Sequence, residues 1–498
     1  MALGQQLAVH RKAAGFTQEM FAAHLADREQ VFYGRSSVAN VERGRQRIGR
    51  DFWVACDMAL ASGGILVAEY DRIMQAIRTQ RIEAVGAAPA LRFDVSRAIG
   101  SRGLAEPVLR AAVLDAPPSL APATVHGEHY LWTPAGRRLA GSAIPAQLHR
   151  AVLNEHVVTQ VPVAYADDPF LSRPSRGLVV GQLDQPSVAF VMDSRHARRR
   201  LRGAGSEARL LIPRAYRLDE LTFALLWAVT SFDEALLADD AIIAAALRDT
   251  EAFAQLDKSA ATRDMAADAS PVSQMWLGSQ FCASHIRRHT AELTDQPVYW
   301  TREQRGEEAA TWLLFDHKHQ YLRKTSAGTD DRSPLVRAFC VPRQAVDDSP
   351  AGERMLLLLA LALMESYGIQ TVVTDLAELV GTPGFVSDRR ARAITATWIG
   401  ADGIWYADVT DNRTTLRGYD DSIGYAINHS INEGPDPWSR LRAFADYLQL
   451  EWKLLVARCA ELGEWGSAGI AEPRSRLLSV GGFDRACRYL GGVDPPDG

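Results

Sequence analysis

The sequence predicts an α+β multidomain protein, with an N-terminal all-α domain, a β-rich middle module and a mixed helical and α/β C-terminal body. The chain has 498 residues, of which 47% are hydrophobic and 23% charged. Such a chain is too long for one core and too apolar to be disordered. The apolar pattern also changes along the chain, from helical spacing to short β-branched runs and then to long helical segments. These observations predict domains at 1–82, 104–211 and 212–498, with a linker at 83–103.

Residues 1–82 show the pattern of a bundle of short helices. Gly15 is expected to end the first helix, and Thr17 is a suitable N-cap for the second. A third helix beginning near Arg35 would place Val38 and Val41 on one side. The five expected helices are LGQQLAVHRKAA, QEMFAAHL, the short helix from Arg35, DFWVACDMALA and ILVAEYDRIMQAI.

Positive charge is concentrated in this N-terminal segment. The net formal charge of the chain is -5, yet residues 1–82 hold eleven Lys and Arg against eight Asp and Glu. The stretch GRSSVANVERGRQRIGR, residues 34–50, carries five arginines and one acid. A basic head on an acidic body indicates that the head binds a polyanion.

The order LGQQLAVHRKAAGFTQEMFAAHL and then SSVANVERGR resembles the helix-turn-helix of the phage-repressor class, the XRE family. The resemblance covers roughly the first 75 residues, over which five helix boundaries and the motif residues agree in order. It rests on a Thr-Gln pair opening the second helix, a short polar third helix and a closing Glu-x-Gly with basic neighbours. The link ADREQVFYG is longer than the usual tight turn, which leaves Phe32 and Tyr33 as either a wedge or a cover.

The resemblance implies a DNA-binding surface on the third helix. In such domains the N-terminal residues of the recognition helix meet base edges in the major groove. Asn40 would suit adenine and Arg35 guanine, and Gln18 would hold a phosphate near the start of the second helix. The implied base-facing residues are Arg35, Ser36, Ser37 and Asn40, and the implied phosphate contacts are Gln18, Arg43, Arg45, Arg47 and Arg50. Glu42 is either a surface acid or a brace for a neighbouring arginine.

The resemblance further implies a sequence-specific transcriptional regulator that binds double-stranded DNA. We expect a homodimer, because one helix in one groove touches few base pairs. We expect a cytoplasmic, nucleoid-associated location, because no secretory signal is visible and the cysteines form no disulfide pattern. The body would dimerise and sense a small-molecule or protein effector whose identity is open. Two alternatives are an enzyme and a protein-interaction scaffold, each docked by the N-terminal helices. A membrane partner is not expected, because the most apolar piece, MLLLLALALMESYGI, has the length of a buried helix.

The middle module is expected to be β-rich. HYLWTPAG, VVTQVPVAY, GLVVGQL and SVAFVMD have the length and β-branching of strands. The module closes on five arginines between Arg195 and Arg202. This cluster predicts either a second nucleic-acid contact or a solvated helix cap.

The body combines long helical patterns with strand-like runs. LDELTFALLWAVTSFDEALLADDAIIAAALRD, EEAATWLLFDHKHQYLRK and RLRAFADYLQLEWKLLVARCAELG read as helices. TVVTD, GFVSD, AITATWIG and GIWYADVTD read as strands. The aromatic residues that would line an effector pocket, or form plain core, are Trp276, Phe281, Trp300, Trp312, Trp398 and Trp405.

No enzymatic activity, catalytic residue, cofactor or metal site is expected. The sequence contains no GxxxxGK[ST], GxSxG or HExxH motif. The five cysteines are scattered without a CxxC pair. His317 and His319 suggest a metal site, but on a helix positions i and i+2 point about 200° apart, so they would not share one ion.

Overall fold

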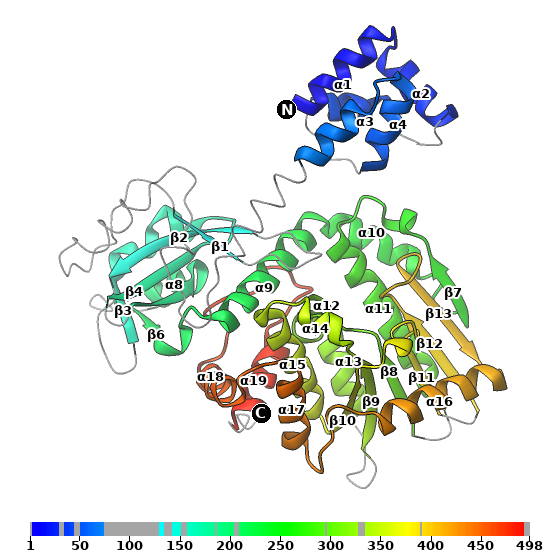
Figure 1. The fold of residues 1–498 in the computed structure, drawn as a ribbon. Coiled ribbons are helices and arrows are strands. Elements are labelled where there is room, and N and C mark those ends of the chain that lie inside the picture. The colour runs from blue at the N-terminus through cyan, green and yellow to red at the C-terminus, as the bar shows by residue number, and fades with distance from the viewer. Residues whose placement is uncertain are drawn as a thin grey trace. The chain divides into compact units, whose positions relative to one another are not determined.

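The computed structural model describes residues 2–28, 34–43, 50–73, 129–133, 142–150, 157–184, 187–203, 209–293, 296–326, 334–388 and 391–492. The chain divides into two compact units, residues 1–92 and 93–498 (Figure 1). The architecture is the expected one, with N-terminal helices, a β-rich middle and a mixed C-terminal body. The predicted linker at 83–103 lies outside the described residues.

The described residues of the first unit form helices joined by short turns. Its helices are α1 (Ala2–Ala13), α2 (Gln18–Arg28), α3 (Arg35–Glu42), α4 (Arg50–Leu60) and a helix over 65–73. Gly15 has φ 76°, and the Phe16 N–H donates to the Arg11 carbonyl, a Schellman closure of α1. The Thr17 hydroxyl accepts from the Met20 N–H at 3.1 Å, which confirms it as the cap of α2.

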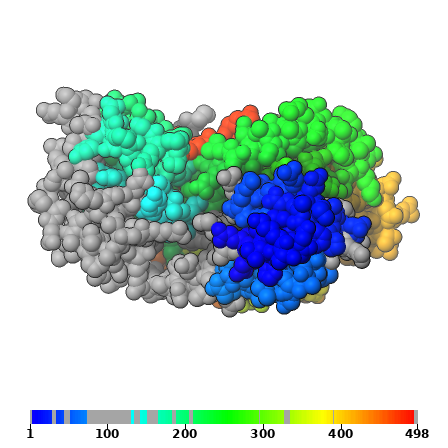
Figure 2. Space-filling model, turned by 90° about the horizontal axis from the view of Figure 1, so that it is seen from above, coloured from blue at the N-terminus to red at the C-terminus, as the bar shows by residue number. Residues whose placement is uncertain are grey.

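One apolar core holds these helices together. Its buried members come from every helix and are Leu3, Leu7, Phe21, Ala22, Leu25, Val38, Val41, Phe52, Trp53, Ala55, Cys56 and Leu66. The space-filling view shows the described residues of this unit, in blues, as one continuous surface (Figure 2). The helical pattern in the sequence therefore corresponds to one packed face on each helix.

The β-rich part of the second unit forms two small sheets. Its elements are β1 (His129–Trp132), β2 (Ala143–Arg150), β3 (Val157–Pro162), β4 (Leu178–Asp184), β5 (Ser187–Asp193), α8 (Ser194–Arg202) and β6 (Arg209–Pro213). One sheet has the order β1-β2-β4-β5, with β2 and β4 parallel, and β3 pairs with β6 in the other. Three of the four predicted strands match β3, β4 and β5. Of the fourth predicted strand, HYLWTPAG, the first four residues form β1.

The body contains a seven-stranded mixed sheet of order β10-β9-β8-β11-β12-β13-β7. Its strands are β7 (Lys258–Ala261), β8 (Val298–Thr301), β9 (Leu335–Cys340), β10 (Ile369–Thr374), β11 (Phe385–Ser387), β12 (Ala393–Thr397) and β13 (Trp405–Thr410). Strands β8, β9 and β10 run parallel, and the others are antiparallel to their neighbours.

Helices cover both faces of this sheet. The helices of the body are α9 (Glu220–Ala238), α10 (Asp240–Thr250), α11 (Pro271–Thr290), α12 (Gly306–Leu314), α13 (Asp316–Ser326), α14 (Arg343–Asp347), α15 (Ala351–Glu365), α16 (Arg413–Asn428), α17 (Pro437–Tyr447), α18 (Trp452–Trp465) and α19 (Gly481–Gly491). Along β8, Val298 and Trp300 pack in the cluster that contains α16 residues, whereas Tyr299 belongs to the larger core. This alternation is what a strand buried on both faces requires.

A single hydrophobic core extends across residue 211, from Leu131 in β1 to Leu490 in α19. The predicted middle module and body therefore share one core. Helix α9 lies in it and is long and apolar enough to cross a membrane by length and composition, with a mean hydropathy of 1.4, yet 78% of that stretch is buried inside this unit. Asp233 of α9 is likewise buried, and Arg176 pairs with it.

Three of the expected long helices are interrupted. The first breaks between α9 and α10 at Asp239, whose carboxylate accepts from the Ser270 N–H at 2.7 Å. The second breaks at Phe315, where the backbone forms a β-bridge with Leu478. The third breaks between α17 and α18, where Gln449 has φ 56°. Each interruption follows from tertiary contacts or backbone geometry that helical periodicity does not report.

Candidate nucleic-acid interface

Helix α3 presents a polar outer face over an apolar inner one. Val38 and Val41 are buried in the core of the first unit, at 0% and 2% exposure. Arg35 and Ser36 are exposed, and Ser37 and Asn40 are partly exposed. The four predicted base contacts thus occupy the side of α3 that faces away from the core.

The Glu42 carboxylate, at the end of α3, joins three helices. Arg11 of α1 donates to it through Nε at 2.5 Å and Nη2 at 3.2 Å, and both side chains are nearly buried. Gln18 of α2 donates its amide to the same carboxylate at 2.7 Å. Of the two hypotheses for Glu42, the brace is the one that the structure shows.

The contact with Glu42 gives the Gln18 side chain a structural role. The sequence predicts a phosphate contact, but the Gln18 amide nitrogen is already bonded to Glu42. The side chain therefore fixes α2 against α3. The predicted phosphate contact of this side chain stays a prediction, and it competes with the Glu42 bond.

The predicted phosphate-binding arginines differ in their surroundings. Arg43 is exposed at the C-terminal end of α3. Arg45 and Arg47 lie outside the described residues, as do Phe32 and Tyr33. Arg50 forms a two-pronged ion pair with Asp71 of the helix over 65–73, at 2.9 to 3.2 Å, and both side chains are about half exposed. Sequence reasoning missed Asp71, because the two residues are 21 positions apart.

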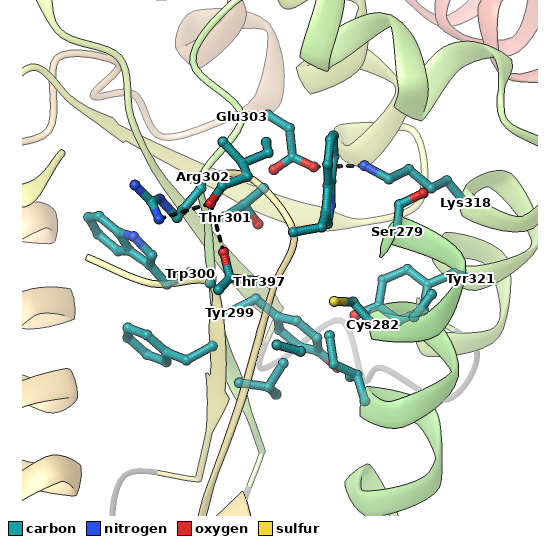
Figure 3. Close-up of a pocket in the computed structure, with 18 of the residues that line it drawn as sticks. Ser279, Cys282, Tyr299, Trp300, Thr301, Arg302, Glu303, Lys318, Tyr321 and Thr397 are labelled. Carbon is teal, nitrogen blue, oxygen red and sulfur yellow. Dashed lines mark hydrogen bonds and ion pairs between the residues drawn. The ribbon is translucent and has the colours of Figure 1, made fainter. Parts of the chain in front are cut away.

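In the body, three of the six predicted aromatic residues line a pocket among α11, α13 and the strands β8, β11 and β12 (Figure 3). These are Trp300, Trp312 and Trp398. Trp276, Phe281 and Trp405 are buried core residues outside its lining. Half of the aromatic set therefore lines a pocket and half is plain core, and the binding of an effector in that pocket stays a prediction.

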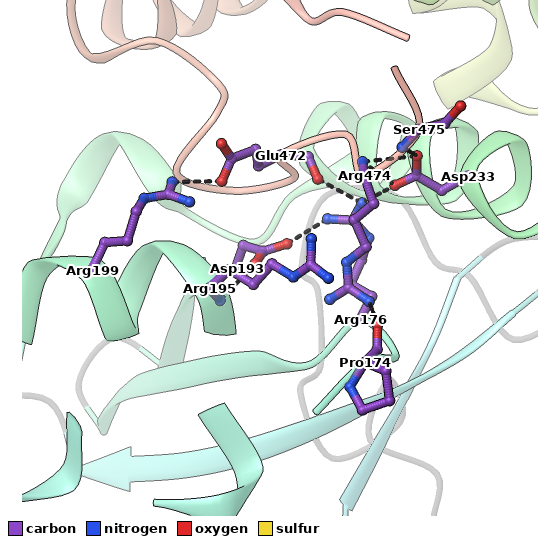
Figure 4. A network of polar contacts seen from close by, with 9 residues as sticks. All are labelled: Pro174, Arg176, Asp193, Arg195, Arg199, Asp233, Glu472, Arg474 and Ser475. Carbon is purple, nitrogen blue, oxygen red and sulfur yellow. Dashed lines mark hydrogen bonds and ion pairs between the residues drawn. The ribbon is translucent and has the colours of Figure 1, made fainter. Parts of the chain in front are cut away.

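The arginine cluster after β5 forms helix α8, which Asp193 caps by accepting from the Arg195 N–H (Figure 4). Arg199 pairs with Glu472, and Arg202 pairs with Asp167 at 2.7 Å. The inner residues Ala197 and Leu201 are buried. The cluster is thus the exposed, partly neutralised face of a capped helix, and the second nucleic-acid contact stays a prediction.

His317 and His319 point to different partners, as the helical spacing predicts. His317 Nε2 lies 2.9 Å from the Ser279 hydroxyl, and burial lowers the pKa of His317 well below its ordinary value. His319 Nε2 lies 2.6 Å from the Tyr367 hydroxyl. Among the described residues, no group of three or more His, Cys, Asp or Glu side chains is placed to hold a metal ion.

Comparison with known proteins supports the N-terminal assignment. Residues 2–70 match the family described as "Helix-turn-helix domain". No protein of established function and no solved structure matches the chain. The N-terminal unit is therefore a helix-turn-helix domain, and DNA is its partner.

Proposed function

We propose that this protein is a sequence-specific transcriptional regulator of the XRE type, in which α3 reads the major groove. The observation that carries the proposal is the outer face of α3, where Arg35, Ser36, Ser37 and Asn40 lie together above a buried apolar face. An α-helix of this kind fits the major groove, and its N-terminal half meets base edges.

In this proposal two residues of α3 read bases directly. The Asn40 amide matches the N6 and N7 pattern of adenine, and the Arg35 guanidinium matches O6 and N7 of guanine. Arg43, at the exposed end of the helix, meets the phosphate backbone. Glu42 keeps the helix in place, because it is bonded to both α1 and α2.

The test begins with selection of bound DNA from random duplexes, followed by affinity measurements on the selected site and on unrelated DNA. Asn40→Ala and Arg35→Ala should each lose about 1 to 3 kcal/mol of discrimination. Arg72→Ala is the matched control, since Arg72 is exposed on the helix over 65–73 and pairs with Glu69. If the double variant that carries both Asn40→Ala and Arg35→Ala bound DNA with unchanged affinity and selectivity, α3 would not be the helix that reads the bases.

We further propose that the protein acts as a homodimer in the cytoplasm, with the body serving dimerisation and regulation rather than catalysis. One helix in one groove touches few base pairs, whereas two heads about one duplex turn apart double the readout. Light scattering at micromolar concentration, with and without the selected DNA, measures the mass directly. A monomer under both conditions would contradict this part of the proposal.

A further inference from the structure

The pocket in the body has an unusual charge balance. Among its deeply buried lining residues are two cations, Lys318 and Arg337, and one carboxylate, Glu303. Lys318 Nζ donates to Glu303 at 2.7 Å and to the Thr311 hydroxyl at 2.9 Å. Figure 3 shows the Glu303–Lys318 pair across the pocket from Tyr299 and Cys282. Arg302 also lines the pocket, but it is only partly buried and donates to the backbone carbonyls of Ile399 and Val380. Among the described residues, no ion pair joins the deeply buried Arg337 to a carboxylate.

Arg337 lies on β9 and is only 3% exposed. Its Nη1 donates to the Thr301 hydroxyl at 3.0 Å, but its Nε and Nη2 have no hydrogen-bond acceptor. The Tyr321 hydroxyl is close enough for Arg337 to lower its pKa, against the larger opposite effect of burial, but it is not aligned as an acceptor. Nε and Nη2 form one edge of the guanidinium fork, the edge that matches the two oxygens of a carboxylate.

Aromatic rings surround both cations. Lys318 Nζ lies 3.9 Å from the centre of the Trp312 ring and 4.8 Å from that of Trp398. The Arg337 guanidinium lies 4.5 Å from the centre of the Tyr299 ring and 5.1 Å from that of Trp312. These cation–π contacts reduce the desolvation free energy of the two buried cations, but they supply no negative charge. Burial, the largest cause, lowers the pKa of Lys318, and Arg337 lowers it further while Glu303 opposes the shift.

The space available suits a small ligand. The cavity measures about 60 Å³ and is partly open to solvent. This volume exceeds what one water needs several times over, since a single water requires roughly 10 to 15 Å³ on the same measure. Aromatic walls with few polar groups are typical of small-molecule sites.

We propose that this pocket binds a small organic monocarboxylate, with its carboxylate against Arg337 and its apolar part between the aromatic walls. The free edge of the Arg337 guanidinium fork favours a planar carboxylate. The binding site is inferred from the geometry of the body alone. That the bound carboxylate is the effector of a transcriptional regulator rests on the proposed function.

The test uses the full chain without DNA, so failure of the DNA-binding proposal leaves its result readable. Fluorine NMR of 4-fluorobenzoate reports binding, with displacement by benzoate, benzamide, benzylamine and inorganic phosphate. Benzoate should compete at least about tenfold better than its neutral isostere benzamide, because only benzoate supplies the missing charge. Equal competition by benzamide, benzylamine or phosphate, or no binding of 4-fluorobenzoate at millimolar concentration, would overturn the proposal.

Two variants locate the site. Arg337→Met should weaken 4-fluorobenzoate binding by about tenfold or more, whereas Arg263→Met, at an exposed arginine outside the pocket, should leave it unchanged. Ala283→Leu narrows the pocket from α11 without removing a charge, and it should also weaken binding. Circular dichroism checks that each variant is folded. If folded Arg337→Met and Ala283→Leu both bind as the wild type does, the ligand site lies elsewhere.

Discussion

At the scale of single residues, the Glu42 carboxylate holds α3 against α1 and α2 through Arg11 and Gln18. Residues 11 and 42 are 31 positions apart, and their side chains are 6% and 7% exposed. Such a buried pair is costly to break, because the remaining charge stays buried without a partner. The orientation of α3 therefore depends on a residue whose side chain is buried against α1 and α2.

We expect Glu42→Ala to destabilise the first unit by about 3 to 5 kcal/mol, since it leaves the Arg11 guanidinium uncompensated. Hydrogen exchange of peptides from α1 to α4 in the full chain measures this. Glu19→Ala, at an exposed acid of α2, is the control. Affinity for selected and random DNA should fall together in Glu42→Ala. Unchanged exchange rates would show that the pair does not stabilise the unit.

The predicted phosphate contacts of the arginines lead to a second prediction, which concerns the salt dependence of DNA binding. Each arginine that meets a phosphate releases about 0.9 of a condensed cation, which sets the slope of log affinity against log salt. Arg43→Ala, or Arg45→Ala with Arg47→Ala, should flatten that slope by nearly one per contact and weaken selected and random DNA alike.

Arg50 should behave differently, because Asp71 holds its guanidinium. Asp71→Asn should strengthen binding to both DNAs and steepen the slope, whereas Arg50→Ala should change the slope less than Arg43→Ala does. Salt titrations of these variants on both DNAs supply the measurement. Parallel lines for every variant would identify the arginines as a solvated face only.

At the scale of elements, Gly4 lets α1 approach the end of α3. A Cβ at this position would lie 2.3 Å from the Val41 carbonyl oxygen and 2.9 Å from that of Glu42. Both neighbours are backbone atoms at the C-terminal end of α3. The fit of α1 against α3 therefore requires glycine here, for lack of space and not for its backbone conformation.

We expect Gly4→Ala to destabilise the first unit by about 1 to 3 kcal/mol, the usual cost of overpacking, and to reduce DNA affinity. Gly418→Ala in α16 is the matched control, since nothing lies within 4 Å of its Cβ position. That substitution should stabilise its helix by about 0.5 to 1 kcal/mol. Hydrogen exchange and thermal unfolding of both variants measure the change in the free energy of unfolding. If both substitutions destabilised, or both stabilised, the protein, the proposed lack of space at Gly4 would be wrong.

At the scale of the whole molecule, buried polar networks join segments that are distant in sequence. Arg176 bonds to Asp193 and Asp233, and it also donates to the Glu472 carbonyl at 2.8 Å (Figure 4). Asp233 also accepts from the Arg474 and Ser475 N–H groups at 3.0 Å. The network therefore ties the β-rich part to α9 and to the segment before α19.

Buried histidines give the second unit a pH dependence. Burial lowers the pKa of His149 to about 4 from an ordinary value of 6.5. Because the unfolded chain then binds a proton that the folded chain does not, stability falls as pH drops from about 6.5 towards 4 and is unaffected above that range. The expected loss from His149 is about 3 kcal/mol at pH 4.

His149→Gln should flatten the dependence of the free energy of unfolding on pH between 4 and 7, whereas His429→Gln, at an exposed histidine, should not. Denaturant titrations at a series of pH values measure both. Curves for His149→Gln that run parallel to those of the wild type would show that His149 is protonated equally in the two states.

The sequence by itself determined the features that depend on neighbouring residues. The helix order of the first unit, the Gly15 and Thr17 boundaries, the polar face of α3 and most strands of the body follow from local periodicity and capping. The sequence analysis missed β7, β8 and β9. Strands β8 and β9 are buried along nearly their whole length and so show no alternation, and β7 has only four residues.

Only the tertiary structure decided which side chains meet across long sequence separations. Glu42 binds Arg11, Arg50 binds Asp71, and Phe315 interrupts a helix by bridging to Leu478. The pocket likewise gathers Glu303, Lys318 and Arg337 from a strand end, a helix and a neighbouring strand. Helical and strand periods specify which face of an element is buried, but not what that face meets, because the partner is set by the packing of the entire chain.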